Sequence, residues 1–580
     1  VENVQEEGLA WSADGRTLAF LSDRETPGQL QLYVTIVSKG PTRRLTNLKG
    51  SVADPKWSPN GRVVAVLLTE GSTEAQDPTA PKMPRLGVAE EQIPEERIVT
   101  VDVDSGRLLK ISPSDLYVYE YDWSSDGKSF AATAAHGEGD DNWYLAQLYT
   151  INAVSGAAHS IWKPPLQIAV PRWSPDGRNI AVIEGLMSDE GITGGDIFEI
   201  PAAGGEARNL TPGMKASASW LTWQNGNRIL CSESLDGQSA LASLDVATGG
   251  TSVLWQSEES NSTGGFNGEI SLAADQKTAA LVLHSFKHPP EVWAGPIGAW
   301  KQITHLNTSV RPAWGRAENL RWENQGIPIQ GWLLHPLHED PARHYPMLVA
   351  VHGGPSSMAR PRWPATLRAP YLYNVALLAH EGYFIFYPNP RGSFGQGEAF
   401  TQSNVKDFGH GDLQDILAGV DQAVRSDPVD PNRIAIAGWS YGGYLAMFAI
   451  TQTNRFRAAI AGAGVANWQS YYGENRIDQW LIPFFGASVY DDPAVYSRSS
   501  PIVFIKNIKT PTLILVGERD GECPVPQSLE FWHALKTLGV PTQLVVYPGE
   551  GHQIVREDHR RDVVKRTMAW LDQYLGSSGP

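Results

Sequence analysis

The sequence predicts two domains of different classes, an all-β propeller followed by an α/β-hydrolase domain. Three observations carry this prediction: a tryptophan-containing repeat in the first half, a strand–turn–helix motif around a serine in the second half, and a length of 580 residues. Single hydrophobic cores rarely organise chains of this length. We therefore expect the propeller to occupy residues 1–315 and the hydrolase domain residues 316–580.

A short repeat recurs through the first half of the chain. Its first copy is Trp11-Ser12-Ala13-Asp14-Gly15, and a strand-like run follows at Gln31–Ile36. Later copies, the last two weaker, begin at Trp57, Trp123, Trp173, Trp223 and Leu272. Each unit combines a strand, a D-G or N-G hairpin and a second strand, as propeller blades do. Six blades are visible, and we expect the repeated tryptophan to fill the space between neighbouring blades.

An insertion interrupts the second blade. The segment from Thr69 to Glu96 is rich in Pro, Glu, Ala and Thr. Long loops of this kind are exposed. We expect this one to lie near the domain interface or on the outer face, either as a functional element or as an inert loop.

The second half contains a G-x-S-x-G motif, Gly438-Trp439-Ser440-Tyr441-Gly442. A β-rich apolar run precedes it at 433–437, and a helix-forming run follows at 444–449. This is the pattern of a nucleophile elbow, in which glycines flank the serine because the backbone passes close to its neighbours. The helix N-terminus would also direct N–H groups toward a developing oxyanion. Ser440 is the predicted nucleophile of a serine hydrolase.

An acid and a base follow in the order that this class of enzyme uses. Asp520 comes in the loop after the apolar strand 512–516, and His552 comes in a glycine-rich loop after the apolar strand 543–547. Both loops would lie at the carboxyl edge of the sheet. We expect His552 to act as the general base and Asp520 to orient it.

Two backbone N–H groups are candidates for the oxyanion hole. The first belongs to Tyr441, directly after the nucleophile. The second belongs to Gly354, because the apolar strand 347–351 leads into His352-Gly353-Gly354-Pro355 and the glycines allow close approach to a substrate carbonyl. A plain glycine turn is the alternative for this loop.

The motifs of the second half form an ordered set. They are His352-Gly353-Gly354-Pro355, Asn389-Pro390-Arg391-Gly392-Ser393, Gly438-Trp439-Ser440-Tyr441-Gly442-Gly443, Asp520 with Cys523-Pro524, and Gly551-His552. Together they resemble the prolyl oligopeptidase family, with the acylaminoacyl-peptidase and dipeptidyl-peptidase branches looking closest. That family usually has seven blades, and this chain begins with Val1. The resemblance therefore implies that an N-terminal blade or a processed leader is missing from the sequence.

Substrate recognition is less clearly marked. The resemblance implies an arginine two residues after the catalytic aspartate, but Glu522 stands there. A carboxylate at this position either attracts an amine or pairs with Arg519 or Arg391, and Arg391 is itself a candidate substrate-binding residue. In the dipeptidyl-peptidase branch, paired acids on the propeller hold the substrate's free N-terminus. Asp189 and Glu190 are the candidates for this role, with a solvated blade loop as the alternative.

An aromatic cluster follows the nucleophile helix. Its members are Trp468, Tyr471, Tyr472, Trp480, Phe484 and Phe485. We expect some of them, with Trp468, Tyr472 and Phe485 as candidates, to line an apolar pocket for the residue before the cleaved bond. The others would be core residues.

Composition excludes several other classes of function. The formal net charge is −16 and no long basic cluster occurs, so nucleic acid is not an expected partner. No apolar run approaches the roughly 20 residues that span a bilayer. We expect a soluble protein, cytoplasmic or periplasmic. Cys231 and Cys523 are the two cysteines, Cys523 being a small buried hydrophobe by expectation, and no disulfide framework, metal-ligand spacing or phosphate-binding motif occurs. No cofactor or metal is implied.

These features predict a serine peptidase that cleaves short peptides through an acyl-enzyme. The leading expectation is an N-terminal exopeptidase that releases an acylated residue or a dipeptide, with the propeller limiting access to small or unfolded substrates. An oligopeptide endopeptidase is the alternative within the class. An esterase or amidase for small molecules and a non-enzymatic scaffold are the alternatives outside it, and homo-oligomer formation stays open.

Overall fold

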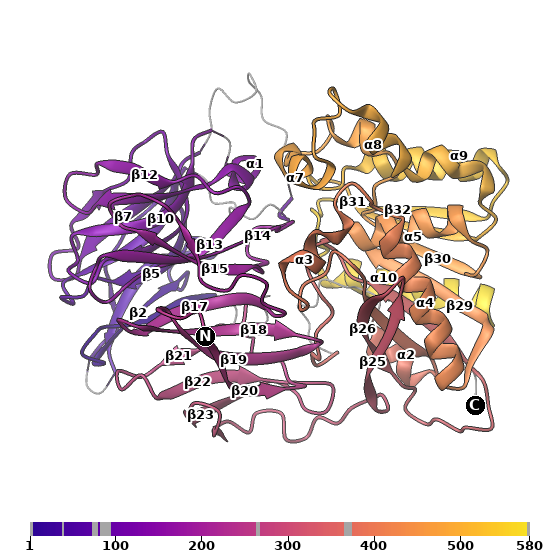
Figure 1. Cartoon of the computed structure of the whole chain (residues 1–580), viewed down its shortest axis with the longest axis horizontal. Coiled ribbons are helices and arrows are strands. Elements are labelled where there is room, and N and C mark those ends of the chain that lie inside the picture. The colour runs from indigo at the N-terminus through magenta and orange to yellow at the C-terminus, as the bar shows by residue number, and fades with distance from the viewer. Residues whose placement is uncertain are drawn as a thin grey trace.

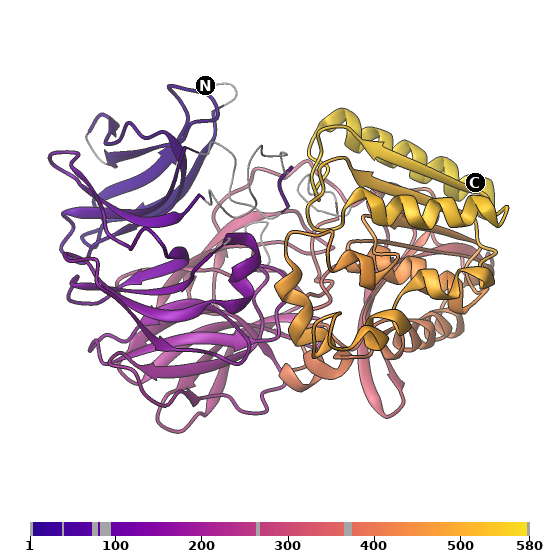
Figure 2. The ribbon, with the colours of Figure 1, turned by 90° about the horizontal axis from the view of Figure 1, so that it is seen from above.

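The computed structural model describes residues 4–37, 40–71, 79–81, 94–137, 139–262, 267–364 and 374–576. The chain forms two domains that lie side by side, a β-propeller and a mixed α/β domain (Figure 1). The first blade and the C-terminal helix lie at opposite ends of the molecule (Figure 2). The predicted boundary between residues 315 and 316 falls in the segment between β24 (Lys301–Gln302) and β25 (Ala317–Asn324).

Within its described residues, the first domain contains six four-stranded antiparallel sheets, each built from consecutive strands. The first three blades comprise β1 Glu6–Trp11, β2 Thr17–Ser22, β3 Gln31–Ile36, β4 Arg43–Arg44, β5 Gly50–Trp57, β6 Val63–Glu70, β7 Glu96–Asp102, β8 Leu108–Lys110, β9 Tyr117–Trp123, β10 Ser129–Ala135, β11 Gln147–Asn152 and β12 Ala158–Trp162. The last three comprise β13 Gln167–Trp173, β14 Asn179–Gly185, β15 Asp196–Pro201, β16 Arg208–Asn209, β17 Ser217–Asn225, β18 Arg228–Leu235, β19 Gln238–Asp245, β20 Thr251–Ser257, β21 Ser271–Leu272, β22 Thr278–Leu283, β23 Glu291–Pro296 and β24. The short helices α1 (Gly139–Asn142) and η1 (Trp143–Leu145) interrupt the third blade.

The sequence repeat corresponds to one hairpin in each of the first four blades. The serine hydroxyl donates a hydrogen bond to the side chain two residues later, over 2.6 Å from Ser12 to Asp14 and 2.7 Å from Ser174 to Asp176. The following glycine has positive φ, for example 66° at Gly15, which only glycine adopts without strain. These local bonds fix the turn that joins the first two strands of each blade.

The repeated tryptophans connect neighbouring blades. The indole N–H of Trp57 donates to the carbonyl of Ala10 over 3.0 Å, and that of Trp123 donates to Lys56 over 3.2 Å. At these two positions the tryptophan adds a directional hydrogen bond between blades, whereas the buried indole N–H of Trp173 has no hydrogen-bond partner among the described residues.

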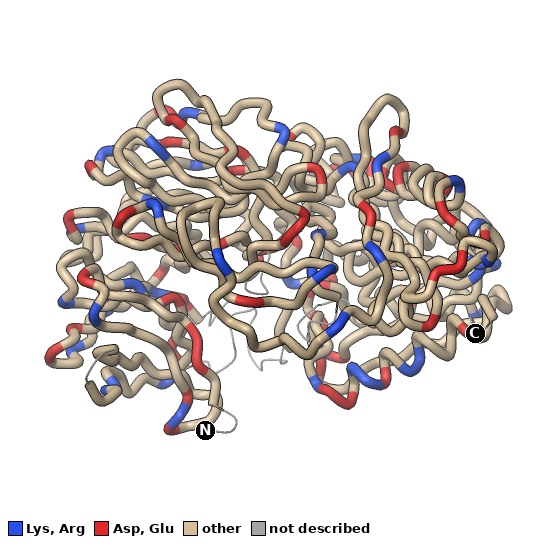
Figure 3. The backbone as a smooth tube through the Cα atoms, turned by 90° about the horizontal axis from the view of Figure 1, so that it is seen from below, with Lys and Arg blue, Asp and Glu red and all other residues tan. Residues whose placement is uncertain are grey.

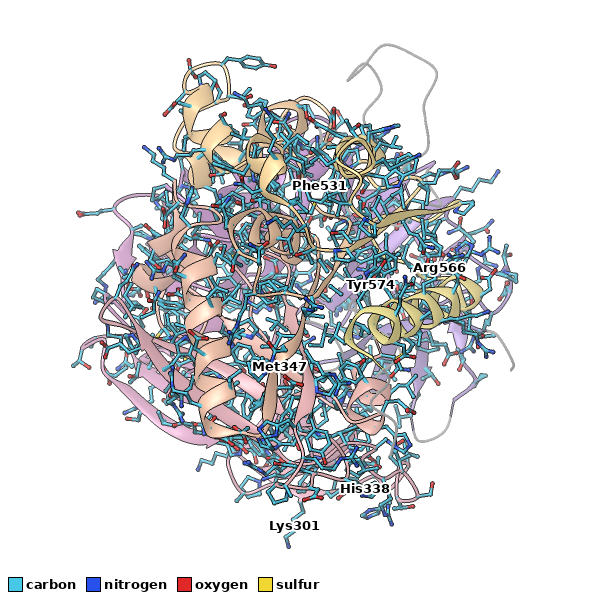
Figure 4. The ribbon with its side chains drawn as sticks, turned by 90° about the vertical axis from the view of Figure 1, so that its right-hand side faces the viewer. Lys301, His338, Met347, Phe531, Arg566 and Tyr574 are labelled. Atoms are coloured by element: carbon cyan, nitrogen blue, oxygen red, sulfur yellow. The ribbon has the colours of Figure 1, made fainter. Side chains whose placement is uncertain are left out.

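The second domain is built on one eight-stranded sheet in the order β25-β26-β28-β27-β29-β30-β31-β32. Its first two pairings are antiparallel and the remaining five are parallel. After β25, its strands are β26 Ile327–Leu334, β27 Tyr345–Val351, β28 Phe384–Asn389, β29 Val429–Trp439, β30 Ala458–Gly462, β31 Thr512–Gly517 and β32 Thr542–Tyr547. Met347, on the central strand β27, is fully buried and lies near the middle of the view in Figure 4.

Helices pack against this sheet, with α4 against β25, β28 and β29, α5 against β29 and β30, and α9 against β31 and β32. The α-helices are α2 Val375–His380, α3 Glu398–Thr401, α4 Gly411–Ser426, α5 Tyr441–Gln452, α6 Trp468–Tyr471, α7 Leu481–Phe485, α8 Pro493–Arg498, α9 Val525–Thr537 and α10 Glu557–Leu575. The 3₁₀ helices are η2 Gln402–Asn404, η3 Asp478–Trp480 and η4 Pro501–Asn507.

Charged residues of both signs alternate over both domains (Figure 3). Among the helices in the described ranges, none has the length and apolar character that crossing a membrane requires.

Candidate active site

Ser440 lies in the sharp turn between β29 and α5, with φ 60° and ψ −125°. This backbone conformation is strained for a residue with a side chain, and such strain persists only where the surroundings impose it. A Cβ atom on Gly438 would lie 2.2 Å from Gly442, and one on Gly442 would lie 2.2 Å from the carbonyl oxygen of Val351. The close approach predicted for the flanking glycines is therefore present.

His552 and Asp520 meet at the carboxyl edge of the sheet. The Nδ1 atom of His552 lies 2.9 Å from Oδ2 of Asp520, and both side chains are buried. The other oxygen of Asp520 accepts hydrogen bonds from the backbone N–H groups of Glu522 (3.0 Å) and Cys523 (2.8 Å). The carboxylate is thus held in place to orient the imidazole.

Glu522 occupies the other side of the same imidazole. Its Oε2 atom lies 3.2 Å from Nε2 of His552. Burial alone would lower the pKa of His552, but the charges of Asp520 and Glu522 and the hydrogen bond to Asp520 raise this pKa to about 10, with a further contribution from Asp189. The arrangement in the structure therefore favours the imidazolium form.

Arg391, which the sequence left open as a substrate-binding residue or a partner of Glu522, lies elsewhere. Its side chain is buried and makes two hydrogen bonds of 2.8 Å to the carboxylate of Asp415. A third side-chain bond reaches Gln325. Arg391 anchors its loop to helix α4 and is not among the residues that line the pocket at Ser440.

The two predicted oxyanion donors flank this pocket. Gly354, with φ 117°, lines it together with Ser440 and Tyr441. The N–H of Tyr441 belongs to the first turn of α5, where N–H groups have no acceptor within the helix. The side chain of His352 fixes the glycine loop, because Nδ1 lies 2.6 Å from the Gly353 carbonyl and Nε2 lies 3.0 Å from Oγ of Ser393.

The pocket at Ser440 is narrow, and four of its twelve lining residues are aromatic. It is lined by Ser188, Asp189, Gly354, Ser440, Tyr441, Val465, Trp468, Tyr471, Ile477, Trp480, Glu522 and Cys523. Its free volume is about 20 Å³, which is room for about one water molecule. Of the three aromatic candidates, Trp468 lines the pocket, whereas Phe485 stacks on Tyr496 and Tyr472 contacts Tyr490 and Tyr496.

Acidic side chains of the propeller reach the same pocket. Asp189 accepts a 2.9 Å hydrogen bond from the Ser188 hydroxyl, and the Ser188 carbonyl accepts one from Tyr144 over 2.9 Å. The pKa of Tyr144 is raised well above its ordinary value. Burial is the largest cause, and the charges of Asp189, Glu522, Tyr471 and Glu190 follow in that order. Three carboxylates from two domains therefore converge on one region.

The predicted insertion in blade 2 reaches the catalytic loop. Of this segment, residues 72–78 and 82–93 lie outside the described residues, whereas 79–81 are described. The backbone N–H of His552 donates to the carbonyl of Thr79 over 2.9 Å. A Cβ atom on Gly551 would lie 2.5 Å from the same carbonyl oxygen. The described part of the insertion thus lies at the domain interface.

Sequence reasoning missed several residues of the site. Val465 and Ile477 line the pocket, and no motif marked them. Phe408 lies at the centre of the aromatic cluster, with its ring centroid 4.8 Å from Tyr441 and 5.1 Å from Phe485. It comes from the loop before α4, distant in sequence from the rest of the cluster, so the cluster's local spacing gave no signal for it.

Comparisons with known proteins agree with this architecture. A family model described as "Prolyl oligopeptidase family" matches residues 370–578. An uncharacterized peptidase of Bacillus subtilis, YuxL, is 29% identical over 97% of this chain and 89% of its own. Dipeptidyl-peptidase 5 of Porphyromonas gingivalis is 24% identical over 79% of this chain and 67% of its own.

The solved structures extend the likeness to the whole fold. An acylaminoacyl peptidase in complex with Z-Gly-Gly-Phe-chloromethyl ketone superimposes with a TM-score of 0.79 and 20% identity, over 100% of this chain and 89% of that one. The predicted fold class, a propeller followed by an α/β-hydrolase domain, is confirmed, and the family model agrees with the predicted resemblance to the prolyl oligopeptidase family over residues 370–578.

Proposed function

The chain carries the catalytic domain of the prolyl oligopeptidase family and is a serine peptidase, and from this premise we propose that it releases dipeptides from the free N-termini of short peptides. In this proposal Ser440 is the nucleophile, His552 the general base and Asp520 the orienting acid. The backbone N–H groups of Tyr441 and Gly354 form the oxyanion hole.

The chemistry follows from these positions. Neutral His552 takes the proton of Ser440 as its oxygen attacks the scissile carbonyl, and the resulting imidazolium returns that proton to the leaving amine. Water then hydrolyses the acyl-enzyme by the same steps in reverse. Asp520 supports both steps of the reaction because its 2.9 Å contact fixes the proton of His552 on Nδ1. Nε2 would become available to Ser440 when Glu522, which lies 3.2 Å from it, is drawn away.

The observation that carries the choice of substrate is the position of Asp189 and Glu522 in the wall of the pocket at Ser440. A substrate ammonium placed between these carboxylates would form charge-assisted hydrogen bonds in a partly desolvated site. An acylated N-terminus offers no positive charge to such a site. Glu190, adjacent to Asp189, adds to the same negative potential, as its effect on the pKa of Tyr144 indicates.

The aromatic wall accounts for the other side of the substrate. Trp468, Tyr471 and Trp480 line the pocket together with Val465 and Cys523. A pocket of this composition favours an apolar side chain before the cleaved bond. In the proposal, the ammonium is held on the acidic side of this pocket and the scissile carbonyl lies at Ser440, so the two side chains that follow the N-terminus would face the aromatic wall.

The propeller limits which peptides reach the site. Ser188 and Asp189 come from the propeller, and the other lining residues come from the hydrolase domain. The pocket therefore lies between the two domains, and the propeller would keep folded proteins away from Ser440.

A matched peptide set tests the proposal. Peptides of one sequence with free, acetylated and internally extended N-termini would be incubated with the wild-type protein and with Ser440→Ala, and the products identified by mass spectrometry. We expect dipeptides from the free form alone, and none with Ser440→Ala. Release of the acetylated residue would favour acylaminoacyl cleavage instead, and internal cuts would favour an endopeptidase. A protein that cuts no peptide while a fluorophosphonate still labels Ser440 would be a small-molecule hydrolase.

A further inference from the structure

A cluster of three side chains lies on the hydrolase domain, built by segments other than those that line the pocket at Ser440. It consists of Glu318 on β25, His335 directly after β26, and Asp427 at the C-terminal end of α4. One potential ligand atom from each residue lies within 4.8 Å of the others. His338, three residues beyond His335, lies at the lower rim of the molecule in Figure 4.

His335 is the informative member of this cluster. Its side chain is only 1% exposed, and its Nδ1 atom lies 2.7 Å from Oε2 of Glu339. Since an ionised carboxylate can only accept, this contact places a proton on Nδ1. The Nε2 atom is buried and has no hydrogen-bond partner in the described part of the chain. It faces Oδ1 of Asp427 at 3.6 Å and Oε2 of Glu318 at 3.8 Å.

We propose that Glu318, His335 and Asp427 form a zinc-binding site. Zinc bonds of about 2.0–2.2 Å to nitrogen and oxygen place the ligand atoms of a tetrahedral site about 3.3–3.5 Å apart. The observed separations of 3.6 and 3.8 Å need only a small contraction to reach this geometry. Three protein ligands leave the fourth position to water.

The ligand set and its support both favour zinc. An imidazole nitrogen suits zinc better than magnesium or calcium, which prefer oxygen ligands throughout. Histidines that bind zinc usually donate their other N–H to a carboxylate, which fixes the ring and raises its basicity. Glu339 stands in that position relative to His335.

Arg316 forms ion pairs with both carboxylates of the cluster. Its Nη1 atom lies 2.6 Å from Oε2 of Glu318 and its Nη2 atom lies 3.1 Å from Oδ1 of Asp427, the same oxygens that face His335. The Arg316 side chain is 59% exposed, whereas that of its partner Asp427 is 4% exposed. The buried carboxylate needs a cation beside it, and zinc would take over this role from Arg316. The guanidinium can therefore swing into solvent and yield both oxygens to the metal.

Bound zinc would tie three separate segments together, namely the start of β25, the end of β26 and the end of α4. A ligand that binds the folded protein and not the unfolded chain stabilises the fold. Zinc at this site would therefore stabilise the hydrolase domain, independently of peptide cleavage.

The test is a metal-binding measurement on the full chain after chelator treatment. Zn²⁺ is added from a chelator buffer, and the bound metal is counted by mass spectrometry. All proteins carry His552→Ala, so that the catalytic histidine does not contribute a ligand. We expect one zinc per chain and a higher midpoint of thermal unfolding with zinc. Asp427→Asn and His335→Gln should lose the ion, and Glu339→Gln should bind it about 10–100-fold more weakly.

Arg316→Ala keeps the proposal testable if the buried variants misfold, because this exposed change should tighten zinc binding. Glu259→Gln, which removes the carboxylate beside His288 on the propeller, is the matched control and should bind zinc as the parent does. Failure of the parent to bind zinc would overturn the proposal. The proposal would also be overturned if Asp427→Asn, Glu339→Gln and Arg316→Ala all bound zinc as the parent does.

Discussion

The Oε2 atom of Glu522 lies 3.2 Å from Nε2 of His552, on the imidazole nitrogen that a general base offers to its nucleophile. A pKa near 10 keeps His552 protonated at neutral pH in this arrangement. The base therefore becomes available when Glu522 is drawn away or neutralised. A substrate ammonium bound by Glu522 would do this, which couples recognition of the N-terminus to activation of Ser440.

Glu522→Gln should move the pH dependence of activity. Catalysis requires neutral His552, so kcat/KM of the wild type should rise with pH toward about 10. Removing one adjacent negative charge lowers the pKa of His552, and the rising limb should move down by about 1–3 pH units. A neutral ester substrate, which does not use the amine anchor, is the appropriate probe. An unshifted limb would contradict the role of Glu522, and exposed Glu518→Gln is the control.

Asp189→Asn should discriminate between peptides by their N-terminus. Loss of a charge-assisted hydrogen bond of about 1.5–3 kcal/mol lowers kcat/KM for free N-termini about 10–150-fold. Cleavage of a neutral ester should not fall, because Asp189 helps to raise the pKa of His552 and its removal leaves more of the neutral base. Steady-state kinetics on both substrates measure the difference, with Glu206→Gln as an exposed propeller control. Equal losses on both substrates would mean that Asp189 supports the fold and does not bind the amine.

Ser440→Ala should abolish turnover while leaving the fold intact. Removal of the nucleophile in serine peptidases costs on the order of 10⁶-fold in kcat. The substitution removes one hydroxyl and keeps the Cβ atom, so the circular dichroism spectrum and unfolding midpoint should match the wild type. A fluorophosphonate should label the wild type and not the variant. Persistent labelling would place the nucleophile elsewhere.

Phe408→Ala should destabilise the hydrolase domain. Phe408 is 1% exposed, and its ring also contacts Trp468, at a centroid distance of 5.6 Å. Truncating a buried phenylalanine costs about 3–5 kcal/mol, which denaturant unfolding measures. Tyr490→Ala is the control, because Tyr490 is 81% exposed. Its free energy of unfolding should stay within about 0.5 kcal/mol of the wild type. If Phe408→Ala lowered the free energy of unfolding no more than Tyr490→Ala does, the central position of Phe408 in the cluster would be contradicted.

Glu398→Gln should reduce the pH dependence of stability. Burial raises the pKa of Glu398 in the hydrolase domain and of Glu184 in the propeller from 4.5 to about 7. A carboxyl group whose pKa is raised in the folded state adds to the free energy of unfolding when it is protonated. This contribution is complete below pH 4.5 and is lost as the pH rises through about 7. Glutamine keeps the acceptor for the N–H of Leu186 without the charge. The variant should unfold at a higher temperature than the wild type at pH 8, and parallel curves of unfolding midpoint against pH would contradict this.

Most of the fold followed from local patterns. The hairpins of the repeat depend on a serine, an aspartate and a glycine within four residues, so the sequence alone specified them. The predicted strand Gln31–Ile36 matches β3 in both bounds. The order of Ser440, Asp520 and His552 relative to their strands also followed from the sequence, and the structure brings Asp520 and His552 into contact.

The contacts that the sequence could not predict join segments far apart in the chain. Glu522 was left open between amine recognition and pairing with an arginine, because its partner depends on side-chain directions that spacing does not encode. Phe408 reaches the aromatic cluster from another loop. Glu318, His335 and Asp427 show no metal-ligand spacing, since the third residue comes from a helix about 90 residues later.

The hydrogen bond from His552 to Thr79 makes the two halves of the chain interdependent. A hydrolase domain excised from this protein would expose the backbone of its catalytic loop to water. It would also lose the hydrogen bond that holds the backbone of His552. Chimaeras that exchange propellers between related enzymes would therefore need to transplant the blade 2 insertion together with the loop that it supports.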